Sequence, residues 1–342
     1  MRDILDQVTA GRQAPARSSI PRTDIPEARM LTHTVRCQSF FIAAAVATAA
    51  LVSAQRGPAR DPLVRENALV RLANHTHVIP DENVGMVPNV GIVVGSRATL
   101  VIDPGMGRRN GEIVLKEVAR VSKNSELFIA STHFHPEHTT GYLAFPPSAK
   151  YINSTTQEAE FEENGMQFVK TFSGRSTFNA ELLKDATRRR ADITFDREYA
   201  LDLGGVRVRF LLVGPTHTRG DTGFFVEGDN VLFAGDVVMN ESWLAANASS
   251  SIKAWLTAFD TFEALKPRTI VPAHGAGGQG TLIAANRAWV RELQERTLAL
   301  KGQGKSIDET ATTVSTEMQA KHPSWPRANG LAALSRSAYE GR

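Results

Sequence analysis

The chain has 342 residues, 42% of them hydrophobic, which is enough to bury a full two-layer core. Its formal net charge of +3 is concentrated near the N-terminus, because residues 1–54 contain six arginines and four acidic side chains and the rest of the chain carries only +1. No basic face requires a polyanionic partner, so nucleic acid binding is not indicated and a small-molecule substrate is expected.

The segment that ends at Ala54 has the pattern of a secretory signal peptide. Arg36 supplies a positive charge, the apolar run Phe40–Val52 follows, and small side chains occupy the last positions before the cleavage point. The run is too short for an ordinary transmembrane span. We therefore expect cleavage after Ala54, a periplasmic or secreted product, and no stable membrane span after processing.

Residues 1–29 are polar and show no such pattern, so Met30 is the expected start of the protein. The single cysteine, Cys37, precedes the cleavage point. The processed chain would contain no cysteine, which excludes disulfides and cysteine-based catalysis. We divide the chain into an upstream segment plus signal peptide at residues 1–54 and a single domain with C-terminal helices at residues 55–342.

Short apolar strands alternate with helices along the second of these parts, without a short-period repeat or a low-complexity linker. Strands are expected at Ala68–Leu72, His77–Ile79, Gly91–Val94, Ala98–Asp103, Leu127–Thr132, Lys150–Asn153, within residues 192–236, and at Thr269–Ala273. Helices are expected at Gly111–Val121, within residues 155–190, and at Ser251–Leu265, Thr281–Leu300 and Ile307–Lys321. This order of elements predicts an α/β fold of two sheets with helices on the outside.

Three histidines and a glutamate occur within six residues, in the segment THFHPEHT. The apolar run before them is typical of a buried strand, so the cluster begins where a strand ends and Pro136 turns the chain. Side chains two positions apart on an extended segment share a face, so His133 and His135 can converge on one ion. Glu137 and His138 lie past the bend and can serve a second ion. Imidazole and carboxylate at this spacing suit zinc or a similar divalent metal.

Three further candidate ligands each follow an apolar strand. His217 lies in the turn GPTHTRGD, Asp236 follows VLFAG, and His274 follows TIVPA. Loops that follow the strands of a sheet gather along one edge, so these side chains are expected near the histidine cluster. Together the four segments predict a two-metal hydrolytic site. Residues 81–88 are expected to form a flap beside it, and residues 240–247, with Trp243, a rim.

The order of these motifs resembles the metallo-β-lactamase superfamily over roughly Ala68 to Gly280. HxHxEH is followed by a Gly-x-x-His turn, a Gly-Asp strand end and a Pro-Ala-His-Gly strand end. The resemblance implies a four-layer αββα sandwich and hydrolysis by a metal-activated hydroxide. It also implies two divalent metal ions, with zinc as the expected metal and iron or manganese as alternatives.

The resemblance further implies a role for each ligand. His133, His135 and His217 would hold the first ion. Glu137, His138 and His274 would hold the second ion, and Asp236 would bridge the two. Asp103, in an aspartate-containing turn after an early strand, is expected to be structural and to lie behind the site.

Two positions bear on the reaction that the resemblance implies. Glu137 stands where most members carry aspartate, and its longer side chain changes the reach of a carboxylate that we expect to be catalytic. Asp236, the second expected catalytic carboxylate, stands where zinc β-lactamases tend to have cysteine or serine. A lactam-, lactone- or ester-like bond is the expected substrate. The alternatives are a glyoxalase II-like thioesterase, an iron-dependent persulfide dioxygenase-like oxidoreductase, and a non-catalytic metal-binding module.

Overall fold

A computed structural model describes residues 60–342 of the chain. The predicted signal peptide, its cleavage after Ala54, the start at Met30 and the cysteine Cys37 lie outside the described residues. Among residues 60–342, no helix combines the length and the apolar character that crossing a bilayer requires.

The first sheet contains seven strands in the order of the sequence. These strands are β1 (Val70–Arg71), β2 (Thr76–Ile79), β3 (Val90–Val94), β4 (Ala98–Ile102), β5 (Glu126–Ala130), β6 (Lys150–Ser154) and β7 (Ile193–Phe195). β1 to β4 overlap the first four strands that the sequence predicts, and they form an antiparallel meander. β4 to β7 are parallel, so each connection between them must cross over the sheet. α2 (Gly107–Val121) makes the first of these crossovers.

The second sheet contains six strands in the order β13-β12-β11-β10-β9-β8. Their bounds are β8 (Glu198–Asp202), β9 (Arg207–Leu212), β10 (Thr222–Val226), β11 (Val231–Gly235), β12 (Thr269–Pro272) and β13 (Gly278–Gln279). All neighbouring strands are antiparallel except β11 and β12, which are parallel and joined by α7 (Ile252–Ala264). Asp236 and His274, which follow β11 and β12, are therefore placed at the same edge of the sheet.

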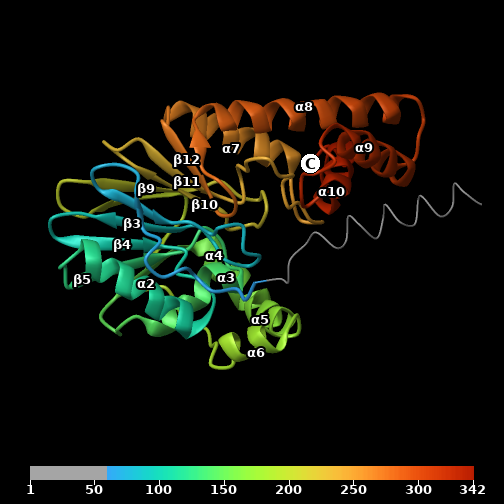
Figure 1. Cartoon of the computed structure of the whole chain (residues 1–342). Coiled ribbons are helices and arrows are strands. Elements are labelled where there is room, and N and C mark those ends of the chain that lie inside the picture. The colour runs from blue at the N-terminus through green and yellow to red at the C-terminus, as the bar shows by residue number, and fades with distance from the viewer. Residues whose placement is uncertain (1–59) are drawn as a thin grey trace, which may run out of the picture. The chain divides into compact units, whose positions relative to one another are not determined.

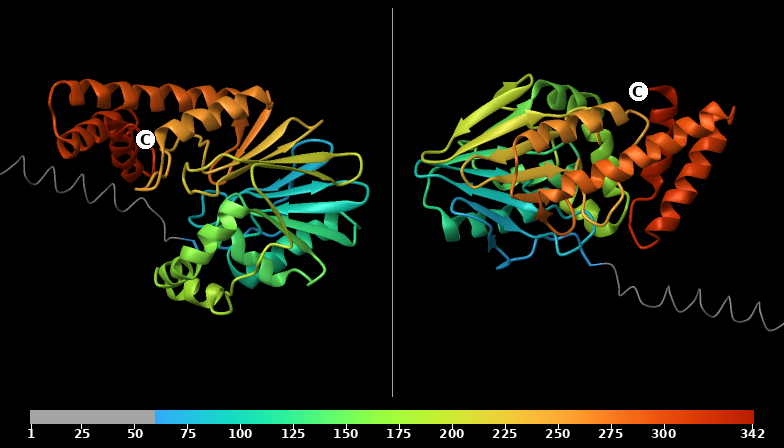
Figure 2. Two further views of the ribbon diagram at one scale, coloured as in Figure 1. Left: turned by 180° about the vertical axis from the view of Figure 1, so that it is seen from behind. Right: turned by 90° about the horizontal axis from the view of Figure 1, so that it is seen from above.

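The remaining helices are short between β5 and β7 and long at the C-terminus. They are α3 (Pro136–Thr139), η1 (Thr140–Ala144), α4 (Thr155–Glu160), η2 (Phe161–Gly165), α5 (Met166–Ser173), α6 (Thr177–Leu183), α8 (Thr281–Gly302), α9 (Ile307–Lys321) and α10 (Asn329–Glu340). The sequence analysis predicts no helix at the position of α10. Figure 2 shows that α8, α9 and α10 lie together at one side of the two sheets.

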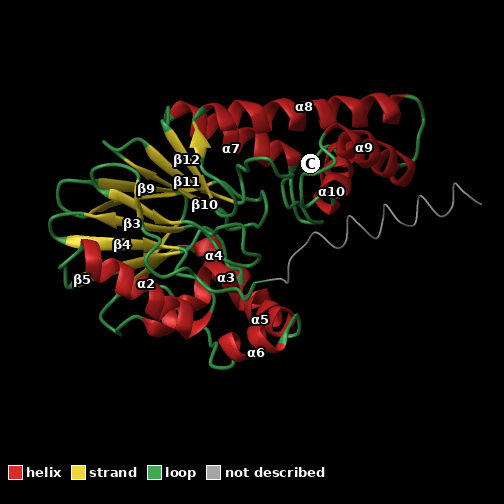
Figure 3. Cartoon of the chain, in the orientation of Figure 1, coloured by secondary structure: helices red, strands yellow, loops and turns green. Residues whose placement is uncertain are grey.

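The two sheets pack face to face and helices cover both outer faces, which confirms the predicted αββα sandwich (Figure 1 and Figure 3). Alternation along the strands explains the layers, because successive side chains point to opposite faces. Leu100 of β4 and Phe128 of β5 face the core between the sheets, where they join Phe210 and Phe224. Val101, the neighbour of Leu100, belongs instead to the outer core beneath α2. On the second sheet the corresponding outer core is built from α7, α8, α9 and α10.

Candidate metal centre

The candidate ligands of the site and Asp103 all come from segments that follow the carboxyl ends of strands. Asp103 follows β4, and the histidine cluster follows β5 in the first sheet. His217, Asp236 and His274 follow β9, β11 and β12 in the second sheet. Since the two sheets face each other, the loops at this edge bring both sets of side chains together.

His133, His135 and His217 form one group of possible metal ligands. His133 Nε2 lies 3.0 Å from His135 Nδ1, and His217 Nε2 lies 3.3 Å from the same atom. Burial lowers the pKa of His133 and His135 well below the usual range of histidine, so both rings are neutral at pH 7. Neutral imidazole is the form that binds metal. Phe168 stacks on the His135 ring, with centroids 4.7 Å apart, and restricts its orientation.

Glu137, His138 and His274 form the second group. Pro136 begins the single turn of α3, and this turn directs Glu137 and His138 away from the extended segment that carries the first two histidines. Glu137 Oε1 lies 3.8 Å from His138 Nε2. Burial lowers the pKa of His138 well below its usual range and raises the pKa of Glu137 to about 8.

Asp236 lies beside the first group and is held by a cation. Its Oδ2 is 3.6 Å from His217 Nε2 and accepts a hydrogen bond of 2.8 Å from Arg327 Nη1. Burial by itself raises the pKa of Asp236, but the nearby positive charge of Arg327 more than offsets this effect. The net pKa lies well below the usual range, so the carboxylate is ionised.

The outer nitrogens of these histidines have hydrogen bond partners that orient the rings. His138 Nδ1 lies 3.0 Å from Asp103 Oδ2, His217 Nδ1 lies 2.5 Å from a backbone oxygen of Ala245, and His274 Nδ1 lies 2.8 Å from that of Val87. Each oxygen accepts a hydrogen bond, so the proton is placed on Nδ1 and the Nε2 lone pair is directed inward. This arrangement is typical of histidines that bind metal.

Asp103 is the support behind the site that the sequence predicts. Its backbone is left-handed, with φ of 55°, and its carboxylate accepts hydrogen bonds from the backbone nitrogen and the hydroxyl of Thr132 at 2.7 and 2.8 Å. It connects the turn after β4 to the start of the histidine cluster. Burial raises the pKa of Asp103 to about 7, although both bonds from Thr132 lower it.

Three buried atoms of the site lack any hydrogen bond partner among the described residues. Whether a bound metal ion would satisfy them shows whether these residues fit a metal. These atoms are Glu137 Oε2, His138 Nε2 and Asp236 Oδ1. Leaving such atoms unpaired costs about 1–3 kcal/mol each, so their concentration in one place requires an explanation. All three belong to side chains that the sequence predicts as metal ligands. The arrangement fits divalent metal ions held by imidazole nitrogens and carboxylate oxygens.

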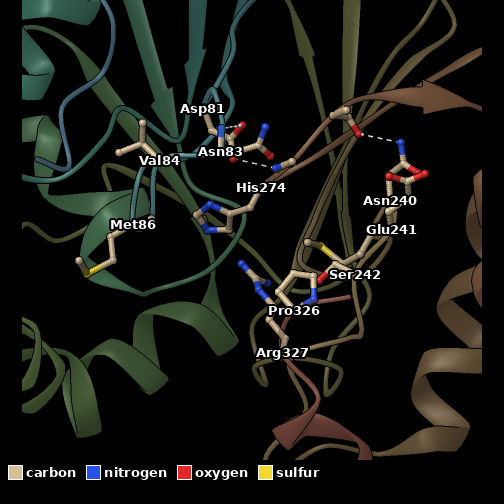
Figure 4. Close-up of a pocket in the computed structure, with 14 residues that line it drawn as sticks. Asp81, Asn83, Val84, Met86, Asn240, Glu241, Ser242, His274, Pro326 and Arg327 are labelled. Carbon is tan, nitrogen blue, oxygen red and sulfur yellow. Dashed lines mark hydrogen bonds between the residues drawn. The ribbon is translucent and has the colours of Figure 1, made fainter. Parts of the chain in front are cut away.

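A pocket of about 440 Å³ opens next to the second group (Figure 4). The predicted flap lines one side through Val84 and Met86, and the predicted rim lines the other through Asn240 and Ser242. The rim prediction is wrong for Trp243, which is completely buried. Its ring packs on the rings of Trp289 in α8 and of Trp325 in the segment between α9 and α10, so it does not face a ligand.

Arg327 is the residue of the site for which sequence reasoning offers no signal. It lies between α9 and α10, 91 residues beyond Asp236, in the segment Ser324-Trp-Pro-Arg. No metal-ligand spacing and no strand end marks this segment. Its position depends on the packing of α10, which was itself not predicted.

The profile of the Metallo-beta-lactamase superfamily matches residues 84–274, which is more than half of the chain. A metallo-beta-lactamase from Pontibacter korlensis superposes with a TM-score of 0.51 at 19% identity, over 63% of this chain and 94% of that chain. The inverting sec-alkylsulfatase Pisa1 from Pseudomonas sp. superposes with a TM-score of 0.60 at 15% identity. That match covers 80% of this chain but only 50% of the sulfatase. No curated protein matches the chain. At these identities the likeness to the two structures concerns the fold.

Proposed function

The chain belongs to the metallo-beta-lactamase superfamily, and we propose that it is a metal-dependent hydrolase with two divalent ions, zinc being the expected metal. The ligands would be His133, His135 and His217 for one ion, Glu137, His138 and His274 for the other, and Asp236 between them. The observation that supports this proposal best is a contrast between the outer and the inner atoms of the candidate ligands. The outer nitrogens of three histidines are occupied by fixed oxygen acceptors, whereas inner atoms of the site are buried without partners.

Divalent ions, when bound, lower the pKa of water to about 7 and polarise a carbonyl oxygen. The side chains of the protein would then orient the reactants. Glu137, once a bound ion has lowered the pKa of its carboxyl group, would orient the attacking water or relay its proton. Asp236, kept ionised by Arg327, would hold its carboxylate in one orientation, because one oxygen is fixed by the 2.8 Å hydrogen bond. Burial of the site restricts competing water.

The bond that is cleaved is proposed to be a lactam-, lactone- or ester-like carbonyl bond, and the panel that tests it includes the alternatives. Purified zinc-loaded protein is assayed with nitrocefin, a lactone, a simple ester, a glutathione thioester, a phosphodiester and an alkyl sulfate. The last is included because of the fold that the chain shares with the alkylsulfatase Pisa1. Turnover of a carbonyl substrate that is lost in Asp236→Asn supports the proposal.

The other outcomes identify the alternatives. Preferential turnover of the thioester supports a glyoxalase II-like enzyme. Bound iron with oxygen consumption on a persulfide supports the dioxygenase-like alternative. Full metal occupancy without turnover of any substrate supports a non-catalytic metal-binding module.

We also propose that the protein is exported to the periplasm or secreted, with cleavage after Ala54. The support is the order of a positive charge, a short apolar run and small residues in the N-terminal sequence. N-terminal sequencing of the protein from an expressing cell tests this. A start at Gln55 in the exported fraction is expected, and an intact Met1 or Met30 terminus in the cytoplasmic fraction contradicts it.

A further inference from the structure

The flap, residues 81–88, is fixed at both of its ends to the segment that carries His274. At its start, the Asp81 carboxylate accepts a 2.8 Å hydrogen bond from the backbone nitrogen of Gly275, the residue after His274 (Figure 4). Near its end, the carbonyl oxygen of Val87 lies 2.8 Å from His274 Nδ1. One wall of the pocket and a candidate ligand of the second ion therefore belong to one hydrogen-bonded unit.

Asn89, which follows directly on the flap, closes this unit. Its Oδ1 accepts a 2.9 Å hydrogen bond from the backbone nitrogen of Asp81, which ties the two ends of the flap together. Its Nδ2 donates to the carbonyl oxygens of Pro272 and Gly275, at 2.9 and 2.7 Å, on either side of His274. Asn89 is buried, and its amide uses its oxygen and both of its hydrogens. This one side chain thus sets the distance between the flap and the His274 segment.

Hydrogen bonds rather than close packing fix this unit, because open space lies on two sides of it. A second cavity, of about 490 Å³, shares a wall with the pocket and is lined by Val78 of β2 and Val271 of β12. Asp81, Asn83 and Gly275 line both cavities. A core segment is held by contacts on all sides, and a cavity removes those contacts from its lining. The position of the His274 segment therefore depends on its hydrogen bonds to the flap and to Asn89.

The flap backbone itself has a conformation that needs support. Glu82, Asn83 and Met86 have left-handed φ angles of 50°, 58° and 62°, which asparagine adopts more readily than glutamate or methionine does. Within the flap, Asp81 accepts hydrogen bonds from the backbone nitrogens of Asn83 and Val84, at 3.0 and 2.9 Å. Such a backbone persists only where its surroundings enforce it. Loss of the hydrogen bonds that hold Asp81 is therefore expected to let the flap open.

We propose that Asn89 is a positioning residue that couples the flap to the second metal position, so that the bound ion orders the flap and the ordered flap raises the affinity for the ion. This inference rests on the proposed two-metal site and adds the control of its second position. When the flap opens, His274 loses the Val87 carbonyl that directs its Nε2 inward.

The coupling must act in both directions. If the ordered flap favours the ion by a given factor, the bound ion favours the ordered flap by the same factor. Because Val84 and Met86 of the flap line the pocket, occupancy of the second position also sets the shape of the surface that meets a substrate. The pocket is then fully formed only in the metal-loaded protein.

Hydrogen exchange of the unmodified full chain tests the coupling without any variant. Exchange at the backbone amides of Asn83 and Val84 is compared in the metal-free and the zinc-loaded protein. Gly204 supplies a matched amide, because it donates to the Asp202 carboxylate in the same type of turn. That turn leads into β9, at the end of this strand away from the metal centre. Zinc should slow exchange in the flap at least about tenfold and leave Gly204 unchanged.

Asn89→Ala tests the positioning role, with Asn110→Ala as its matched control. Asn110 is also buried, and it also uses its whole amide on backbone groups, those of Pro62, Val64 and Met106. None of these three lines the pocket. A competition titration with a chromophoric zinc chelator resolves the two binding steps.

Asn89→Ala should weaken one of the two zinc steps at least about tenfold and leave the other nearly unchanged, and zinc should no longer slow exchange in the flap. Asn110→Ala should lose a similar amount of stability but keep both zinc affinities and the slowing by zinc. If Asn89→Ala does not fold, Asn89→Asp takes its place, because it keeps the acceptor for Asp81 and removes both donors.

Three results would overturn the inference. The first is an unmodified protein that binds two zinc ions without slower exchange in the flap. The second is an Asn89 variant that matches Asn110→Ala in zinc affinity and in flap exchange, and the third is an Asn89 variant that loses both zinc steps equally. A protein that binds no zinc overturns both the inference and the proposed function. Coupled zinc binding in a protein that hydrolyses nothing in the panel would support the role of Asn89 while the hydrolase proposal fails.

Discussion

Replacing Asp103 with asparagine should weaken the second metal position while sparing the first. The carboxylate accepts from Thr132 nitrogen, from Thr132 Oγ1 and from His138 Nδ1, at 2.7, 2.8 and 3.0 Å. Asparagine has nearly the same shape and is one of the residues that tolerate the left-handed backbone at this position. One of its two positions is a donor instead of an acceptor, however. If the amide oxygen stays with the Thr132 nitrogen, the amide NH₂ faces His138 Nδ1.

That contact changes the tautomer of His138. Facing a donor, Nδ1 must act as an acceptor, so the proton moves to Nε2, the atom that would bind the metal. Loss of such an outer partner typically costs about 10- to 100-fold in metal affinity, or about 1.4–2.7 kcal/mol. The first position should change less, because Phe168 and the Ala245 carbonyl support His135 and His217 independently of Asp103. Asp103 reaches His133 only indirectly, through the hydroxyl of Thr132. Above pH 7, where Asp103 with its pKa of about 7 is mostly ionised, the unfolding free energy of the metal-free protein should fall by about 1–2 kcal/mol, since hydrogen bonds to a charged group become neutral ones.

The assay is a competition titration with a chromophoric zinc chelator, which resolves two binding steps, combined with chemical denaturation of the metal-free protein. Asp229→Asn is the matched control. Asp229 is also buried and also accepts from a backbone nitrogen, that of His75, and a threonine hydroxyl, that of Thr76. It lies in the turn before β11, whereas Asp236 follows the other end of that strand.

Asp229→Asn should therefore lose a similar amount of stability and keep both zinc affinities. Equal affinities in Asp103→Asn and the unmodified protein would refute the assignment of Asp103 as the partner that orients His138. A uniform loss at both positions would show that the aspartate supports the edge of the sheet as a whole.

Three further outcomes are expected. Glu137→Gln should lower zinc occupancy at the second position more than Glu137→Asp does, because glutamine keeps the size and removes the charge. Elemental analysis measures the occupancy, and equal values in both variants and the unmodified protein would exclude Glu137 as a ligand. Gly330→Ala should cost more than about 1 kcal/mol in thermal unfolding, the opposite of the usual gain in a helix, because a Cβ would overlap the carbonyl oxygen of Leu244. Gly302→Ala, with open space around the new atom, is its control and should not destabilise. Removal of metal with a chelator should lower the melting temperature of the protein, and added zinc should restore the original value, since a ligand that binds only the folded state stabilises that state. An unchanged melting temperature would argue against metal at the buried site.

Local patterns account for what could be predicted from the sequence. Alternating or continuous apolar runs mark the strands, and polar ligand residues placed directly after those runs share an edge once the sheets form. The αββα architecture and the proximity of the histidine cluster to Asp236 follow from this register. Asp103 could also be placed behind the site, because a turn after an early strand ends at the same edge.

Other features depend on contacts between residues far apart in the chain. The oxygen acceptors behind His217 and His274 are backbone carbonyls of Ala245 and Val87, and a carbonyl has no sequence signature because every residue has one. The burial of Trp243 is set by α8 and the segment before α10, so its side chain alone could not distinguish a rim from a core. Arg327 reaches Asp236 only because α10 packs against the loop after β11, with Gly330 allowing the close approach. The local sequence around each of these residues is compatible with several environments, and long-range packing selects one.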